Sequence, residues 1–309
     1  MEVHRNIEQL PYFRNAVVTI GTFDGVHMGH RQIIEKLKAE AKRINGETVI
    51  ITFHPHPRKV IASTILGIRL LNTLDEKIEL LSKLEIDHLV VVPFTEAFAN
   101  QPAEEYVKNF LINKFQPHTI IIGYDHRFGK ERKGDYKLLE KMADDYNYEL
   151  LEIPKHMLDE IAISSTKIRE ALLEGKIETA DKLLGYEFFF SGTVVDGDKL
   201  GKKLGYPTAN LRIADEEKLI PGNGIYAVYV QLQDSSRRMK GMMSIGFRPT
   251  VDGKKRVVEV NIFDFSKEIY DQTLKVYVKK FLRDEFKFDN LHDLVKQIDQ
   301  DKLDSLQVL

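Results

Sequence analysis

The first half of the chain alternates continuous apolar runs with amphipathic segments. The apolar runs predict buried strands, because parallel strands covered by helices on both faces are apolar along their whole length. The strand candidates are Val17–Ile20, Thr48–Phe53, His88–Val92, Thr119–Ile122 and Glu149–Ile153. Helix candidates, with apolar residues three and four positions apart, are His30–Ile44, Leu74–Lys83, Ala103–Lys114 and Tyr136–Tyr146. This βαβ rhythm predicts a Rossmann-like α/β domain with a parallel sheet.

The second half, after Tyr186, has shorter apolar runs separated by turn signals, which predict an antiparallel barrel or sandwich. The strand candidates are Phe188–Val195, Ile225–Leu232, Lys240–Ile245, Arg256–Phe263 and Thr273–Phe281. The amphipathic segment Leu291–Leu303 predicts a terminal helix, and Ile168–Leu184 predicts a helical connection interrupted at Gly175. We therefore expect two domains with a boundary near Gly185: residues 1–185 as α/β, and residues 186–309 as a β-barrel with a terminal helix.

Composition narrows the class of protein. The 309 residues are enough for two domains, and 43% hydrophobic with 30% charged residues is typical of a globular protein. A formal net charge of −2 opposes nucleic-acid binding driven by bulk charge. The absence of cysteine excludes disulfides, thiolate metal sites and a cysteine nucleophile. Neither a signal segment nor a long apolar span is evident, so we expect a cytoplasmic protein that does not bind membranes. A homo-oligomer stays open.

The run Gly21–His30 joins the first strand candidate to the first helix candidate. A strand, a glycine-containing turn and a helix N-terminus together form a phosphate site, because free N–H groups and the positive dipole end point into the turn. His27 and His30 share one helix face and could donate to a phosphate that gains charge. Gly29 between them would let the phosphate approach the backbone. The short string is common by chance, so its strand–turn–helix context carries the prediction.

A second anion-binding pattern lies near the end of the first half. The hydroxyls of Ser164, Ser165 and Thr166 precede a helix candidate, and one of them would cap it. Lys167 and Arg169 lie in its first turn, where basic residues oppose the helix dipole. An anionic ligand at this helix start would explain them. A plain helix cap is the simpler interpretation, and the two roles can coexist.

These two patterns resemble motifs of the nucleotidylyltransferase superfamily. Together with Thr52–Pro57 and Gly123–Gly129, they resemble the FAD synthetase module of the bacterial bifunctional riboflavin kinase/FAD synthetase family. The resemblance implies transfer of AMP from ATP to FMN with release of pyrophosphate and without a covalent enzyme intermediate. It implies catalytic roles for His27, His30 and Arg169. The implied ATP-binding residues are Gly21, Phe23, Asp24, Gly25, Gly29, Ser164, Ser165 and Thr166, and the implied flavin-binding residues are Asp125, Phe128 and Tyr106.

Two positions depart from the pattern of that family. His126 stands where the family commonly has an aromatic residue, and His54 stands where it commonly has Asp. Both lie on the flavin side of the predicted site, so altered FAD synthesis is an alternative. His54 and His56 could also bind a metal, but the flanking Pro55 and Pro57 favour a rigid strand exit.

A glycine-rich block in the second half carries another pattern. Glycines interleaved with lysines, between Gly197 and Gly205, suit a mobile loop over phosphates, and a solvated loop is the alternative. Pro207 favours extended backbone, and continued extension would project Thr208 and Asn210 to one side. Their hydroxyl and amide oxygens suit Mg²⁺. Plain turn residues are the alternative interpretation.

This block resembles the riboflavin kinase module of the same family, whose Pro-Thr-Ala-Asn motif matches residues 207–210 in full. The resemblance implies that Thr208 and Asn210 contact the metal and ATP. It implies that Glu259 accepts the proton of the riboflavin 5′-hydroxyl and that Arg283 lies near the flavin. The candidate ATP-binding residues of the block are Gly192, Gly197, Lys199, Gly201, Gly205 and Pro207.

Both motif sets occur in one chain, and the resemblance extends from about Val17 to Asp301. We therefore expect an enzyme that phosphorylates riboflavin to FMN with ATP and Mg²⁺, then adenylylates FMN to FAD. Two alternatives remain: an enzyme with only one of the two activities, and a flavin-binding regulator without turnover. A nucleic-acid role is opposed by the near-neutral charge and the lack of a basic stripe.

Overall fold

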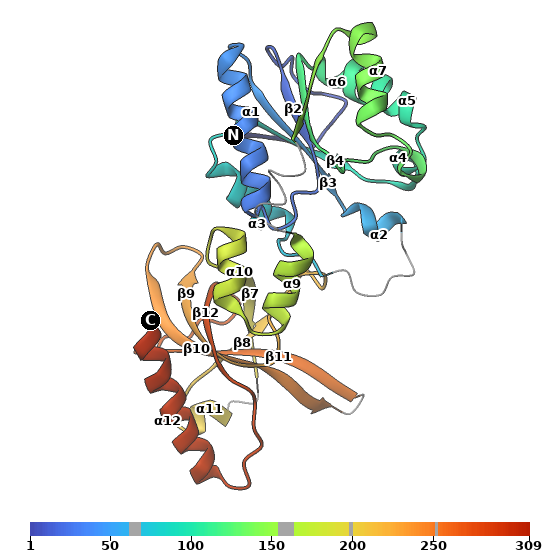
Figure 1. The fold of residues 1–309 in the computed structure, drawn as a ribbon. Coiled ribbons are helices and arrows are strands. Elements are labelled where there is room, and N and C mark those ends of the chain that lie inside the picture. The colour runs from blue at the N-terminus through green and yellow to red at the C-terminus, as the bar shows by residue number, and fades with distance from the viewer. Residues whose placement is uncertain (62–68, 154–163, 198–199, 251–252) are drawn as a thin grey trace. The chain divides into compact units, whose positions relative to one another are not determined.

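The computed structural model describes residues 1–61, 69–153, 164–197, 200–250 and 253–309, and the chain divides into two compact units (Figure 1). The first unit is Met1–Ser164 and the second is Ser165–Leu309. The helical segment before Gly185 belongs to the second unit by this division. The domain boundary near Gly185 stays a prediction, because compactness alone does not define where a functional module begins.

The first unit is built on a parallel sheet in the order β1-β4-β3-β2-β5-β6. Its strands are β1 (Glu2–His4), β2 (Val17–Ile20), β3 (Thr48–His54), β4 (His88–Pro93), β5 (Thr119–Gly123) and β6 (Glu149–Ile153). The predicted strands are confirmed, and the short β1 is an addition. β2 is buried at every residue and pairs with β3 on one side and β5 on the other. The strand order reverses at β2, and open parallel sheets bind ligands at the carboxyl end of such a strand.

Helices fill the connections between these strands as predicted. They include α1 (Met28–Arg43), α3 (Leu74–Ser82) and α7 (Tyr136–Tyr146). A capping box starts α3: the Thr73 hydroxyl accepts from the Glu76 N–H at 3.2 Å, and the Glu76 carboxylate accepts from the Thr73 N–H at 3.0 Å. The short α2 (Pro57–Ile61), α4 (Glu96–Ala99) and η2 (Lys130–Arg132) are additions to the prediction.

The α-helix predicted at Ala103–Lys114 is wrong in its centre. The segment comprises α5 (Ala103–Glu105), the π-helix η1 (Tyr106–Ile112) and α6 (Asn113–Phe115). The wider π turn places residues four or five apart on one face. The ring centroids of Tyr106 and Phe110 lie 5.0 Å apart, and those of Phe110 and Phe115 lie 5.3 Å apart. This aromatic packing favours the π turn, which amphipathic spacing alone does not distinguish from an α-helix.

The second unit begins with α9 (Ser165–Leu173) and α10 (Ile177–Leu184), which confirms the interruption predicted at Gly175. A closed barrel follows, in the order β10-β11-β8-β7-β12-β9, so the barrel interpretation is confirmed and the sandwich is wrong. Its strands are β7 (Phe189–Val195), β8 (Ala209–Arg212), β9 (Gly224–Leu232), β10 (Arg238–Thr250), β11 (Gly253–Ile262) and β12 (Thr273–Arg283). The short α11 (Leu200–Lys203) precedes β8, and α12 (Leu291–Val308) ends the chain. No helix among the described residues has the length and apolarity needed to cross a bilayer.

A buried ion pair ties α12 to the barrel. Arg283, at the end of β12, donates from Nε and Nη2 to the two carboxylate oxygens of Asp301, at 2.7 Å each. Asp301 is 3% exposed and also accepts from Gln297 Nε2 at 3.0 Å. A bidentate pair of this kind fixes the orientation of both side chains. The pair therefore sets how the terminal helix packs on the barrel.

Replacing Asp301 by Asn should lower the free energy of unfolding of the barrel by about 3 kcal/mol, because the shielded Arg283 guanidinium loses its charge partner. Urea unfolding of the full chain, followed by circular dichroism, measures the change. Asp304→Asn is the matched control, since Asp304 on the same helix accepts from Gln300 at the surface. The free energy of unfolding of this control variant should fall by less than about 0.5 kcal/mol. Equal losses for the two variants would contradict the role of the pair.

Candidate active sites

A strained turn joins β2 to α1. Phe23, Gly25 and Val26 have φ angles of 47°, 91° and 39°, all in the left-handed region that favours glycine. A β-branched valine in this region is unusual, and such strain concentrates at functional sites. The turn ends at His27, which is the N-cap of α1. The predicted strand–turn–helix arrangement is confirmed.

Two imidazole rings stack at the start of α1. The backbone N–H of His30 donates to Nδ1 of His27 at 3.4 Å, so a neutral His27 ring carries its proton on Nε2. The ring centroids lie 3.7 Å apart, with planes inclined by 14°. A Cβ at Gly29 would lie 3.3 Å from the His27 ring. Gly29 therefore makes room for the ring itself, a reason that the sequence did not suggest.

The environment of His30 keeps its ring neutral. Burial lowers the pKa of His30 well below its usual value, and the neighbouring His27 and Lys77 lower it further. The buried Nδ1 of His30 has no hydrogen-bond partner among the described residues. A buried polar atom without a partner is costly and needs an explanation. A ligand at this turn supplies one.

Two buried side chains support the turn from within the unit. Asp24, 3% exposed, accepts from the N–H groups of Leu71 and Asn72 at 2.9 and 3.3 Å. Lys77, 6% exposed, donates to the Thr22 carbonyl at 2.6 Å, and burial lowers the pKa of Lys77 to about 8. Asp24 thus holds the backbone of Leu71 and Asn72 in place. Its role in ATP binding stays a prediction. Lys77 was missed because no local motif marks a contact between residues 55 positions apart.

A cavity of about 370 Å³ adjoins the turn. The predicted residues that line it are Gly21, Phe23, His30, Tyr106, Asp125 and Phe128. Tyr106 and Phe128 stack with ring centroids 5.0 Å apart and planes inclined by 27°. Stacked rings offer a flat apolar wall that suits an aromatic ligand. The structure therefore brings ATP-side and flavin-side candidates to one cavity.

His126 lines the same cavity. Its buried Nε2 has no hydrogen-bond partner among the residues that the structure describes. Burial lowers the pKa of His126 to about 4, although the neighbouring Asp125 raises it. The sequence marked His126 only as a departure from the family pattern. His54, the other departure, is exposed and is not among the lining residues of the cavity.

The second anion-binding pattern lies at the start of α9. Ser165, Thr166 and Arg169 fall within its first turns, and Ser164 precedes it directly. Ser164 and Thr166 are exposed, whereas Arg169 is half-buried. The helix belongs to the second compact unit. The role of these four residues at the ATP site stays a prediction.

The Pro-Thr-Ala-Asn motif of the barrel leads into β8. Asn210 on β8 pairs in register with Glu259 on β11. The Thr208 hydroxyl donates to Oε1 of Glu259 at 3.4 Å, and Nη2 of Arg248 donates to Oε2 at 2.5 Å. The structure therefore brings the predicted metal-binding side chains to the predicted base. Arg248, which orients that carboxylate, was not predicted.

Two glycines of the block pack closely against the motif and the residue before it. A Cβ at Gly197 would lie 2.2 Å from Nδ2 of Asn210, and a Cβ at Gly201 would lie 2.3 Å from the Tyr206 carbonyl oxygen. Contacts that short do not occur, so any larger residue would displace the motif. Lys199 lies outside the described residues. The ATP contacts of this loop stay predictions.

The other candidates of the block shape its backbone. A Cβ at Gly192 would lie 2.9 Å from the Ile213 side chain, and Gly205 has a φ angle of +86°. The Pro207 carbonyl accepts from Nδ2 of Asn261 at 2.7 Å. The close approach at Gly192 and the positive φ of Gly205 explain these two glycines without a ligand.

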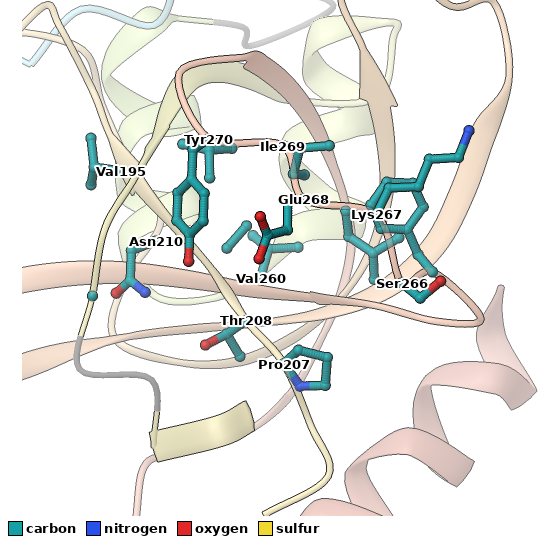
Figure 2. A pocket seen from close by; sticks show the side chains of 15 residues that line it. Val195, Pro207, Thr208, Asn210, Val260, Ser266, Lys267, Glu268, Ile269 and Tyr270 are labelled. Atoms are coloured by element: carbon teal, nitrogen blue, oxygen red, sulfur yellow. The ribbon is translucent and has the colours of Figure 1, made fainter. Parts of the chain in front are cut away.

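Thr208 borders two cavities of the barrel. The first, of about 380 Å³, has mostly apolar walls, and Figure 2 shows Thr208, Asn210 and Tyr270 around it. The second, of about 240 Å³, is lined by Thr208 and Glu259 together with Arg283. Thr208 thus stands at the border of both cavities, the first of which contains the Glu268 carboxylate and the second the Glu259 carboxylate. This arrangement suits transfer of a group between two bound ligands.

Two charged groups of the second cavity, Arg283 and Glu285, have contacts that the sequence did not predict. Arg283 lines it as expected, but Asp301 engages its guanidinium. Glu285 lines it as well, and burial raises the pKa of Glu285. A Cβ at Gly246 would lie 2.0 Å from a Glu285 carboxylate oxygen, so this glycine makes room for the carboxylate. Glu285 was missed because one carboxylate in an acidic segment has no distinguishing spacing.

Comparisons with known proteins cover both units. The family model for FAD synthetase matches residues 10–167, and that for riboflavin kinase matches residues 184–309. The bifunctional riboflavin kinase/FMN adenylyltransferase of Buchnera aphidicola subsp. Schizaphis graminum is 39% identical over 306 residues, covering 97% of this chain and 96% of its own. The Listeria monocytogenes protein of that name is 37% identical over 292 residues, covering 94% and 91%. A solved structure described as a macrolide-efflux protein from Streptococcus pneumoniae has a TM-score of 0.84 at 30% identity over 97% of both chains.

The fold and the two sites define a fused pair of nucleotide-dependent domains, one of nucleotidylyltransferase type and one of kinase type. With both family models matched and near-complete coverage of its relatives, the chain belongs to the bifunctional riboflavin kinase/FMN adenylyltransferase family. This confirms the resemblance and the predicted fold class. The roles of individual residues stay predictions.

Acid should destabilise the first unit through His126. Because its pKa is lowered from 6.5 to about 4, the unfolded chain binds a proton between these pH values that the folded chain does not. This contribution to stability is complete above pH 6.5 and falls as the pH drops, by about 2 kcal/mol between pH 7 and pH 5. Urea unfolding of the full chain at both pH values measures the loss.

His126→Phe should remove this part of the acid sensitivity, because phenylalanine fills the site without titrating. His54→Phe is the matched control, an exposed histidine of the same unit, and it should keep the sensitivity of the unmodified protein. If His126→Phe lost as much stability in acid as the unmodified protein, the buried neutral state of His126 would be wrong.

Proposed function

We propose that the barrel unit phosphorylates riboflavin to FMN and that the first unit adenylylates FMN to FAD. The observation that carries this proposal is that each compact unit has its own cavity lined by the nucleotide-site candidates of its own family motif. ATP, riboflavin and FMN are then the small-molecule substrates. We expect this chemistry in the cytoplasm, with neither nucleic acid nor membrane as a partner.

In the kinase step, ATP occupies the cavity bordered by Asn210, and riboflavin occupies the cavity that contains Glu259. Thr208 borders both, so the γ-phosphoryl group and the riboflavin 5′-hydroxyl meet beside it. Glu259 accepts the hydroxyl proton, the hydroxyl oxygen bonds to phosphorus, and ADP leaves. Arg248 holds the carboxylate in place through its hydrogen bond. Positioning accounts for most of the rate enhancement in such a reaction.

Mg²⁺ fits the donor set of the motif. The Thr208 hydroxyl and the Asn210 amide oxygen are hard oxygen ligands, and Gly197 makes room for the Asn210 side chain. These two side chains would hold the ion together with phosphate oxygens. Its chemical contribution is to neutralise charge that develops on the phosphates.

In the adenylylation step, ATP binds at the histidine turn and an FMN phosphate oxygen attacks the α-phosphorus. Pyrophosphate leaves, and no covalent enzyme intermediate forms. His27 and His30 donate N–H groups to the phosphate oxygens, and a neutral His30 ring still carries one N–H group that can do so. Tyr106 and Phe128 provide the flat wall for an aromatic ring. Ser164, Ser165, Thr166 and Arg169 complete the phosphate contacts in this proposal, on the strength of the family motif.

Single-site variants should separate the two activities. Glu259→Gln and Asn210→Ala should each lower kcat/KM for FMN formation at least about 100-fold, because a proton acceptor or a phosphate-positioning ligand is lost. Both should leave FAD formation from supplied FMN unchanged. His30→Ala should show the opposite pattern. Chromatography of the flavins formed from riboflavin, and separately from FMN, measures both activities.

The activity of the unaltered unit is the internal control in each variant. Glu178→Gln, which changes an exposed carboxylate of the second unit, is the matched surface control and should keep both activities. Loss of both activities in a folded Glu259→Gln variant would contradict the assignment of one reaction to each unit. The proposal would also be contradicted if the unmodified protein, supplied with riboflavin, ATP and Mg²⁺, formed neither FMN nor FAD.

A further inference from the structure

Two histidines and a glutamate meet at the β1 edge of the parallel sheet, apart from the cavity of that unit. β1 pairs in parallel with β4, which sets Glu2 opposite His88. Among the described residues, Glu2, His4 and His88 place one ligand atom each within 4.8 Å of one another. Glu2 and His4 lie outside the segment matched by the FAD synthetase family model, which starts at residue 10. None of the three side chains lines the cavity of this unit.

The nitrogen and oxygen atoms have the spacing of a metal site. Nε2 of His4 lies 3.1 Å from Nδ1 of His88, and Glu2 carboxylate oxygens lie 3.9 Å from Nδ1 of each histidine. Two imidazole nitrogens on one tetrahedral zinc ion are about 3.3 Å apart, given bonds of about 2.0–2.1 Å. The histidine pair is therefore spaced for a shared cation with only a small adjustment. The exposed Glu2 side chain can turn toward it.

A second carboxylate, that of Glu47, lies near the His88 ring. Nε2 of His88, the nitrogen that faces away from His4, lies 3.6 Å from Oε2 of Glu47. The same Glu47 oxygen accepts from the Arg14 N–H at 2.9 Å, which fixes its position. A carboxylate on the far nitrogen of a ligating histidine sets the tautomer and makes the ring a better ligand. This arrangement leaves Nδ1 of His88 as the ligating nitrogen.

The histidine rings are shielded and held in place. Their side chains are 9% and 14% exposed for His4 and His88. Both rings pack on the buried Phe13, with centroid separations of 5.8 and 4.9 Å. A rigid pair of imidazoles binds a metal with little loss of side-chain entropy.

We propose that Nε2 of His4, Nδ1 of His88 and the Glu2 carboxylate bind a divalent transition-metal cation of the zinc class. Two imidazoles and one carboxylate favour such a cation over Mg²⁺ or Ca²⁺, which prefer oxygen ligands. The cation would link β1, only three residues long, to β4. It would thereby stabilise this edge of the sheet without taking part in either reaction.

Zinc titration of the full chain, without a polyhistidine tag and in excess Mg²⁺, tests the proposal. Calorimetry should show one Zn²⁺ equivalent that is lost in His4→Gln and in His88→Gln. Glutamine keeps hydrogen-bonding groups in place of the imidazole, and both activities report whether the variants are folded. Glu47→Gln should bind that equivalent 10–100-fold more weakly, because it removes the supporting carboxylate charge. X-ray absorption of the zinc-loaded protein should show two imidazole ligands in the unmodified chain.

His292→Gln is the matched control, since it removes a histidine on α12 far along the chain, and it should keep the zinc equivalent. Zn²⁺ should also raise the melting temperature of the unmodified protein and not that of His4→Gln. Equal zinc binding by the unmodified protein and His4→Gln, or no binding by either, would overturn the proposal. The 3.1 Å contact would then be a plain imidazole–imidazole hydrogen bond.

Discussion

The pairing of Asn210 with Glu259 across β8 and β11 is the constraint on which the chemistry of the barrel depends. β8 contains only four residues, yet it pairs with β7 on one side and β11 on the other. Barrel closure thus holds a short polar strand against a carboxylate, with Thr208 at the boundary of two cavities. Without this register, a nucleotide and a hydroxyl acceptor would have no common border.

In the first unit, a strained turn takes the place of strand register in positioning the candidate nucleotide site. Its central strand β2 ends in a turn with positive φ angles, and the following helix is capped by an imidazole. Burial keeps His30 neutral, and buried Lys77 holds the turn through the Thr22 carbonyl. Stacked aromatic residues face the same cavity. Strain and burial are thus concentrated where phosphate and an aromatic ring are expected to bind.

Features with a local signal in the sequence were predicted well. Continuous apolar runs identified β2 to β5, because a parallel sheet buries both faces of its inner strands. The Pro-Thr-Ala-Asn and histidine motifs identified Thr208, Asn210 and His30, which the structure places at the cavities. β8 was missed because Leu211 is its only buried side chain, so the strand has no apolar run. Lys77 and Glu285 were missed because their roles arise from contacts between distant segments. Arg248 was missed because its contact with Glu259 depends on the pairing of β10 with β11.

The central claim is that one polypeptide carries two separate nucleotide sites, one for each of its two family modules. Equilibrium binding of a non-hydrolysable ATP analogue, with Mg²⁺ and saturating flavin, tests it most directly. Two analogue molecules per chain are expected, with one lost in Asn210→Ala and the other lost in His30→Ala. A single analogue molecule per chain, removed by either substitution, would contradict the claim.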